Sequence, residues 1–192
     1  SFFVTYGNID DWSPASAAPP VAERNLLDQW ILADLHHLVQ TVTDAYENYD
    51  VTSATRPVQD FVEGLSNWYV RLSRRRFWKS ESDEEKLGAY ATLHECLVTV
   101  SKLLAPAMPF LSEAIYRNLV AEVDADAPPS VHLALWPQVD ESRLGETLRN
   151  EMALVQRLVS LGLAARNNNT VDGVVEPIGV RQPLASASFA LP

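Results

Sequence analysis

The sequence predicts an all-α fold, an antiparallel helical bundle with at most a small β-hairpin after Thr170. Five segments carry apolar residues at spacings of three and four, the pattern of a helix with one buried face. The breaks between these segments are short, which favours antiparallel neighbours. The 192 residues include only seven glycines, and 47% are hydrophobic, enough to fill a core.

The first two helices should form a hairpin. One is expected over residues 25–46, with Asn25 as its N-cap and Asp28 in its first turn. The other is expected from residue 51 or 52 to residue 77, after so short a break that the two should be antiparallel. Pro57 lies near its start, where it occupies the first turn or kinks the helix. The predicted apolar stripes are Leu27, Ile31, Leu35, Leu38, Val42, Ala45 and Tyr49, then Val58, Phe61, Val62, Leu65, Tyr69 and Leu72.

Three more helices are expected further along the chain. The third begins at the capping box Ser82-Asp83-Glu84-Glu85 and ends before Pro106. A short fourth helix spans Pro109 to Val120, Ser130 to Pro137 is a short extended piece, and the last helix runs from about Asp140 to Arg166. Their predicted stripes are Leu87, Tyr90, Leu93, Leu97, Val100 and Leu104, then Leu111, Ile115 and Leu119, then Leu144, Leu148, Met152, Val155 and Val159.

One face of the second helix collects polar and cationic side chains. Asn67, Arg71, Arg74 and Trp78 follow at offsets of four, seven and eleven, which places them on one side, with Arg75 beside them. Arginine forks bind phosphates in a bidentate way, and an exposed indole can stack on a base. The row is therefore a candidate RNA-binding face. From composition alone, a solvated helix end is the commoner explanation, with Trp78 plugging the core.

Composition and motifs exclude several other kinds of site. The net charge of −10 means that RNA can bind only where the cations cluster. Cys96 is the only cysteine, so an internal disulfide is impossible and a cysteine-based zinc site implausible. His36 and His37 are adjacent, point to different faces and have no partner at ligand spacing, so no metal site is expected. No catalytic set or glycine-rich phosphate loop is found.

The chain is also expected to be soluble and cytoplasmic. Its apolar runs fall well short of the ~20 residues that cross a membrane, so no membrane partner is expected. The first residues do not form a signal-peptide pattern.

Several motifs resemble one protein family. Residues 66–71 read Ser-Asn-Trp-Tyr-Val-Arg and residues 73–78 read Ser-Arg-Arg-Arg-Phe-Trp. Together with the proline-marked corner 103–116 and with Val-Arg-Gln-Pro-Leu at 180–184, they resemble the anticodon-binding domain of the isoleucyl-tRNA synthetases, class I aminoacyl-tRNA synthetases. The valyl, leucyl and methionyl enzymes share this bundle, but the arginine-rich run favours the isoleucine family. The competing class is a helical protein–protein interaction module without RNA binding, which would expose apolar residues in place of Arg71 and Arg74.

The resemblance implies that this chain binds tRNA and that catalysis takes place in other parts of a parent enzyme. A parent enzyme of this family attaches isoleucine to its tRNA with ATP and magnesium, and is expected to be monomeric. The signatures His-Ile-Gly-His and Lys-Met-Ser-Lys-Ser are both missing here, so this fragment should be inactive, with no catalytic residue, metal or cofactor of its own. It should bind the anticodon stem-loop of isoleucine tRNA. By matching position, Trp78 is the best candidate for base stacking, and Asn67, Arg71, Arg74 and Arg75 come next.

The resemblance also predicts three regions. Residues 1–20 should be a connector from a catalytic domain outside this chain, because an apolar start is followed by a proline-rich stretch. Residues 21–166 should form the anticodon-binding helical bundle. Residues 167–192 should be a linker and the start of a further C-terminal domain.

Overall fold

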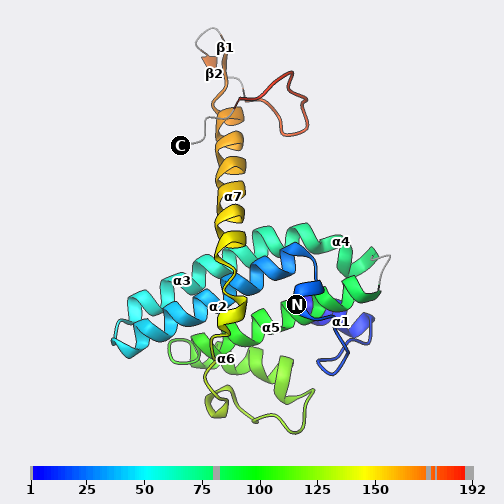
Figure 1. Cartoon of the computed structure of the whole chain (residues 1–192), viewed down its shortest axis with the longest axis vertical. Coiled ribbons are helices and arrows are strands. Elements are labelled where there is room, and N and C mark those ends of the chain that lie inside the picture. The colour runs from blue at the N-terminus through cyan, green and yellow to red at the C-terminus, as the bar shows by residue number, and fades with distance from the viewer. Residues whose placement is uncertain (1, 80–82, 172–173, 176, 189–192) are drawn as a thin grey trace. The chain divides into compact units, whose positions relative to one another are not determined.

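The computed structural model describes residues 2–79, 83–171, 174–175 and 177–188. The chain forms two units, Ser1–Glu146 and Thr147–Pro192. Helices dominate both units, which confirms the predicted all-α class (Figure 1). None of the helices in these described stretches is long and apolar enough to cross a membrane.

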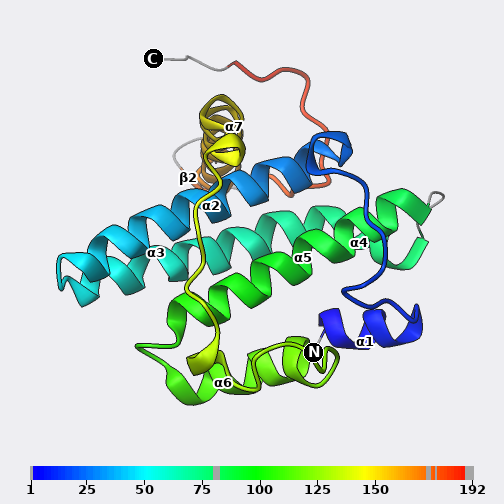
Figure 2. The ribbon, with the colours of Figure 1, turned by 60° about the horizontal axis from the view of Figure 1, so that its bottom comes forward.

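The first unit is built on a hairpin of two long helices. Helix α2 (Leu26–Glu47) is capped by the Asn25 side chain, which accepts a hydrogen bond from the Leu27 amide at 3.0 Å, as predicted. Helix α3 (Val51–Gly64) begins at Asp50, whose side chain accepts from the Ser53 amide. Figure 2 shows the two helices side by side and antiparallel. Tyr49 was wrongly assigned to the core: it lies in the turn with a φ of 58° and is 93% exposed.

The predicted second helix contains a change of helix type. After α3, the π-helical segment η2 (Leu65–Val70) leads directly into α4 (Arg71–Lys79). Pro57 lies inside α3, beyond its first turn. A π turn is wider than an α turn, so residues spaced by four can stay on one face. The buried residues are accordingly Phe61, Leu65, Tyr69, Ser73 and Phe77. The predicted stripe was wrong at Leu72, which follows the π segment and is exposed, because it assumed a uniform α-helix. It was also wrong at Val62, which is exposed within α3.

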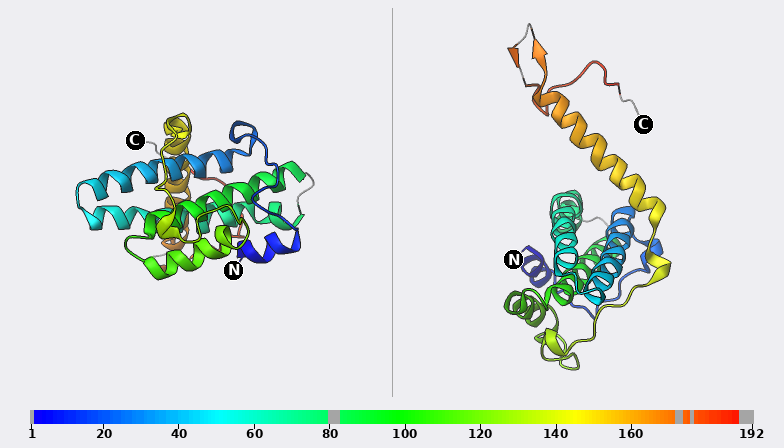
Figure 3. Two further views of the ribbon diagram at one scale, coloured as in Figure 1. Left: turned by 90° about the horizontal axis from the view of Figure 1, so that it is seen from below. Right: turned by 90° about the vertical axis from the view of Figure 1, so that its left-hand side faces the viewer.

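Helix α5 (Asp83–Leu104) lies at the centre of the unit and is buried on several sides. Ser82, the first residue of the predicted capping box, lies outside the described residues, while Asp83, Glu84 and Glu85 occupy the first turn as expected. Cys96 is fully buried, and burial raises the pKa of its thiol well above the ordinary value. Figure 3 shows the bundle helices crossing the left view and seen nearly end-on in the right view.

An aromatic cluster joins the first residues to the bundle. Helix α1 (Phe2–Ile9) brings Phe2 to 5.4 Å from Phe77 between ring centroids, and Phe3 to 6.0 Å from Tyr90. Trp12 stacks on Tyr90 with centroids 5.6 Å apart. The 3₁₀ turn η1 (Val21–Glu23) then leads into α2. The initial segment therefore contributes to the core next to the end of α4.

The fourth helix and the segment after it differ from prediction. Helix α6 (Pro109–Tyr116) continues as the π-helical segment η3 (Arg117–Ala121). It buries Ser112, Tyr116 and Leu119, whereas Leu111 is 48% exposed, so its predicted inward position was wrong. The predicted extended piece begins as the 3₁₀ turn η4 (Val131–Leu133), because the Ser130 side chain caps it by accepting from the His132 amide. His132 is exposed.

Residues 136–145 form a strap across α2. The Trp136 indole donates to Thr43 Oγ1 at 2.8 Å, and the Asp140 amide donates to His36 Nδ1 at 3.2 Å. Asp140 also caps the 3₁₀ turn η5 (Glu141–Arg143), and Gly145 has a φ of 48°. A Cβ at Gly145 would lie 3.0 Å from Ala33 Cβ, so a side chain here would be both strained and crowded. The predicted start of the last helix at Asp140 was therefore wrong by six residues: α7 begins at Glu146.

The second unit contains α7 (Glu146–Asn167) and a two-stranded antiparallel sheet. Strand β1 (Thr170–Val171) pairs with β2 (Val174–Val175), as the predicted C-terminal hairpin requires. Asp172 and Gly173, between the two strands, lie outside the described residues. The chain then returns to the end of α7, where the Arg166 guanidinium donates to the carbonyls of Gly179 and Gln182.

Candidate nucleic-acid interface

All five predicted interface residues are exposed and belong to one continuous helical segment. Asn67 belongs to η2, and Arg71, Arg74, Arg75 and Trp78 belong to α4. Each of them is exposed, and Trp78 is 60% exposed. We call these five residues the basic face. Its indole does not plug the core, because the neighbouring Phe77 ring fills that position and is fully buried.

The three arginines of the basic face, Arg71, Arg74 and Arg75, form no ion pair within the described part of the chain. Exposed cations without a neighbouring carboxylate keep their full charge for a polyanion. The chain has a net charge of −10, so this surface is a local exception to its acidity.

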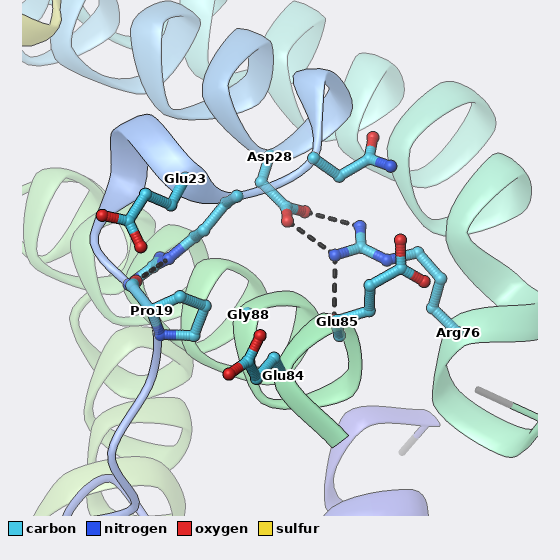
Figure 4. A pocket seen from close by; sticks show the side chains of 9 residues that line it. Pro19, Glu23, Asp28, Arg76, Glu84, Glu85 and Gly88 are labelled. Carbon is cyan, nitrogen blue, oxygen red and sulfur yellow. Dashed lines mark hydrogen bonds and ion pairs between the residues drawn. The ribbon is translucent and has the colours of Figure 1, made fainter. Parts of the chain in front are cut away.

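The fourth arginine of the run turns inward and holds α4 against two other helices. Arg76 donates from both terminal nitrogens to Asp28 of α2, at 2.7 Å and 2.6 Å, and a further bond of 2.9 Å reaches the Glu85 carbonyl of α5. The Tyr69 hydroxyl donates to the same carboxylate at 2.6 Å. Figure 4 shows the paired guanidinium and carboxylate side by side, with Glu85 below them. Asp28 is completely buried, so these donors replace the hydrogen bonds that its oxygens would make to water.

Burial and the Asp28 charge have opposite effects on the pKa of Arg76 and the same effect on the pKa of Tyr69. Burial alone would lower the pKa of Arg76, but the hydrogen bonds and the negative charge of Asp28 outweigh it and raise that pKa. Burial raises the pKa of Tyr69 well above its usual value, and the Asp28 charge raises it further. Arg76 therefore stays charged and the Tyr69 hydroxyl stays a donor across the physiological range.

A polar pocket of about 320 Å³ opens beside this ion pair. Pro19, Glu23, Arg24, Asn25, Asp28, Arg76, Glu84, Glu85 and Gly88 line it (Figure 4). Three glutamates at the pocket repel a phosphate, so the pocket does not extend the basic face. In the stretches of chain that the structure describes, no group of three or more His, Cys, Asp and Glu side chains could hold a metal ion.

The ion pair was not predicted from the sequence, although a signal for it exists. Asp28 precedes Ile31, Leu32 and Leu35 by three, four and seven residues, so it lies on the buried face of α2. A carboxylate on an apolar face requires a cationic or donating partner. The partner was missed, although Arg76 follows Leu65, Tyr69 and Leu72 by eleven, seven and four residues and so lies on the predicted apolar stripe.

Comparison with known proteins agrees with the helical fold. The model of the family described as the anticodon-binding domain of tRNA ligases matches residues 28–174. The chain belongs to this family. The match begins at Asp28 and includes the whole basic face.

Individual relatives point to the isoleucine branch of the family. An isoleucine–tRNA ligase of Dehalococcoides mccartyi (strain CBDB1) is 50% identical over 193 residues, which cover 100% of this chain and 18% of the relative. The isoleucine–tRNA ligase of Thermobifida fusca is 48% identical, with 100% of this chain and 18% of the relative covered. That of Clostridium novyi is 43% identical over 96% of this chain and 17% of the relative. The chain thus spans about a fifth of the length of these curated relatives, and the resemblance carried by residues 66–78 is confirmed.

Proposed function

We propose that this chain is the anticodon-binding part of an isoleucine–tRNA ligase and that its basic face contacts the anticodon stem-loop of isoleucine tRNA. The observation that carries the proposal is the exposed row on η2 and α4, whose cations lack a carboxylate partner within the described residues. This row lies inside the region matched by the anticodon-binding family.

The side chains of the basic face are suited to binding the phosphates and unpaired bases of an RNA loop. Arg71, Arg74 and Arg75 offer forked donors to phosphate oxygens, and these contacts hold the RNA without reading its sequence. Trp78 offers a flat exposed ring on which an unpaired base can stack. The Asn67 amide has both a donor and an acceptor for a base edge. Unpaired loop bases are where proteins read RNA sequence, since A-form grooves hide base edges.

In this proposal the reaction itself belongs to other parts of a longer ligase. Those parts would use ATP with magnesium to attach isoleucine to the tRNA, and this chain would hold the same tRNA in register. We infer that the ligase acts in the cytoplasm and as a monomer, as the family resemblance implies.

The salt dependence of tRNA binding tests the proposal in the full-length ligase. We expect Arg71→Ala and Arg74→Ala each to weaken binding, and to reduce the slope of log affinity against log salt by about 0.7 per lost phosphate contact. Arg117→Ala is the control, because this side chain is 59% exposed on a different helical segment. If both arginine variants bind with the affinity and slope of the wild type, the basic face is only a solvated surface.

A further inference from the structure

The Asp28–Arg76 ion pair joins three helices at one point. Its carboxylate comes from α2, its guanidinium from α4, and the Glu85 carbonyl that accepts from the same guanidinium comes from α5. The Tyr69 hydroxyl of η2 completes the set. The described hydrogen bonds of Arg76 all run to other helices of the bundle, and none of them reaches a residue of the basic face.

Stability alone is a weak explanation for such a pair. Removing two charges from water is costly, and apolar residues of similar volume often stabilise a core equally well or better. A bidentate arginine–carboxylate pair is instead strongly directional, because both N–H bonds of the planar fork must meet both oxygens. The pair therefore restrains the rotation of α4 about its own axis more tightly than apolar packing does.

The rotation of α4 matters because of the π segment before it. In a regular α-helix, positions repeated every four residues drift by about 40° per turn, and a π turn changes this relation. The phase of α4 therefore does not follow from α3. Arg76 lies two residues before Trp78 and directly after Arg75, so the angle that satisfies Asp28 also sets the direction of these exposed side chains.

We propose that Asp28 and Arg76 are positioning residues for RNA binding: the ion pair fixes the angle at which α4 presents the basic face. This inference rests on the function proposed above. A second carboxylate supplies a matched comparison, since Asp10 accepts from the Lys86 ammonium and the Tyr90 hydroxyl in a similar arrangement. That cluster ties α5 to the segment after α1 by hydrogen bonds, and its contact with α4 is the edge of the Tyr90 ring packed against Phe77.

The test compares tRNA affinity, salt slope and melting temperature in the full-length ligase. Arg76→Lys keeps the charge and loses the fork. We expect affinity to fall about tenfold or more, as when one charge-assisted contact is lost, with a lower salt slope because fewer arginines reach phosphates. Asp10→Asn should lower the melting temperature without changing either binding quantity. Wild-type affinity and slope in Arg76→Lys, whatever its melting temperature, would overturn the inference.

A second variant guards against loss of folding. Asp28→Leu combined with Arg76→Met removes both charges at nearly constant total volume, so it avoids leaving one charge buried alone. We expect it to melt near the wild-type temperature and still to bind tRNA weakly; wild-type binding by this variant would also overturn the positioning role. The proposed function is judged separately: if Arg71→Ala and Arg74→Ala lose binding while both pair variants keep it, only the positioning role fails.

Discussion

At the residue scale, replacing Trp78 shows whether its indole serves RNA binding or core packing. Its side chain is 60% exposed, and Phe77 occupies the core beside it. We predict that Trp78→Ala weakens tRNA binding by about 1–3 kcal/mol, the usual value of one base–aromatic stack, and leaves the salt slope unchanged because no charge is lost. Binding titrations and thermal melting of the same variant are needed. A large fall in melting temperature with intact binding would assign the indole to the core.

Leu65 provides a second residue-scale prediction, on stability. It is 5% exposed at the first position of η2, whereas Glu63 two residues earlier is exposed. We expect Leu65→Ala to reduce the free energy of unfolding by about 2–5 kcal/mol, because the cavity can collapse only in part. Glu63→Ala should change it by about 0.5 kcal/mol or less. Urea denaturation of both variants gives the comparison, and equal midpoints would mean that the helix is phased differently.

At the scale of elements, the strap over α2 makes stability depend on pH. Nδ1 of the buried His36 ring accepts a hydrogen bond from the Asp140 amide, so this nitrogen carries no proton. Burial lowers the pKa of His36, an effect that outweighs the nearby Glu95 carboxylate. Burial likewise lowers the pKa of His94. The unfolded chain therefore binds more protons below about pH 6.5, and stability should fall as the pH decreases from there.

His36→Gln isolates this effect. Glutamine can accept the Asp140 amide bond but does not titrate, so the loss of stability between about pH 8 and about pH 5.5 should be smaller than in the wild type. His132→Gln serves as the control, because this histidine is exposed in a 3₁₀ turn. Urea midpoints at the two pH values measure the difference. An identical pH dependence in wild type and His36→Gln would show that the strap does not titrate through this ring.

The elements also show what sequence patterns could and could not predict. The helical hairpin, the Asn25 cap and the five exposed side chains of the basic face were predicted, because they depend on local spacing and capping. The exposure of Leu72 and the burial of Ser73 were not, because a π turn is not visible in a pattern that assumes 3.6 residues per turn. The 3₁₀ turns at residues 131–133 and 141–143 were missed for a related reason: side-chain caps at Ser130 and Asp140 shape only a few residues.

At the scale of the whole molecule, the acidity of the chain is compatible with the proposed RNA binding, because the exposed arginines are grouped in one place. The chain carries 25 acidic and 15 basic residues, yet three arginines with no described carboxylate partner share one surface with an exposed indole. General acidity limits non-specific attraction of RNA, and a confined cationic row allows binding in one place. The proposed interface would therefore confine the docking of tRNA to one place on this domain.

Footprinting of isoleucine tRNA on the full-length ligase tests the central claim most directly. Hydroxyl-radical cleavage should show the anticodon loop protected by the wild-type protein. In the combined variant Arg71→Ala, Arg74→Ala, Trp78→Ala, this protection should be lost while protection elsewhere on the tRNA remains, because the substitutions alter only the basic face. Equal protection of the anticodon loop by both proteins would contradict the assignment of the basic face as the RNA-binding surface.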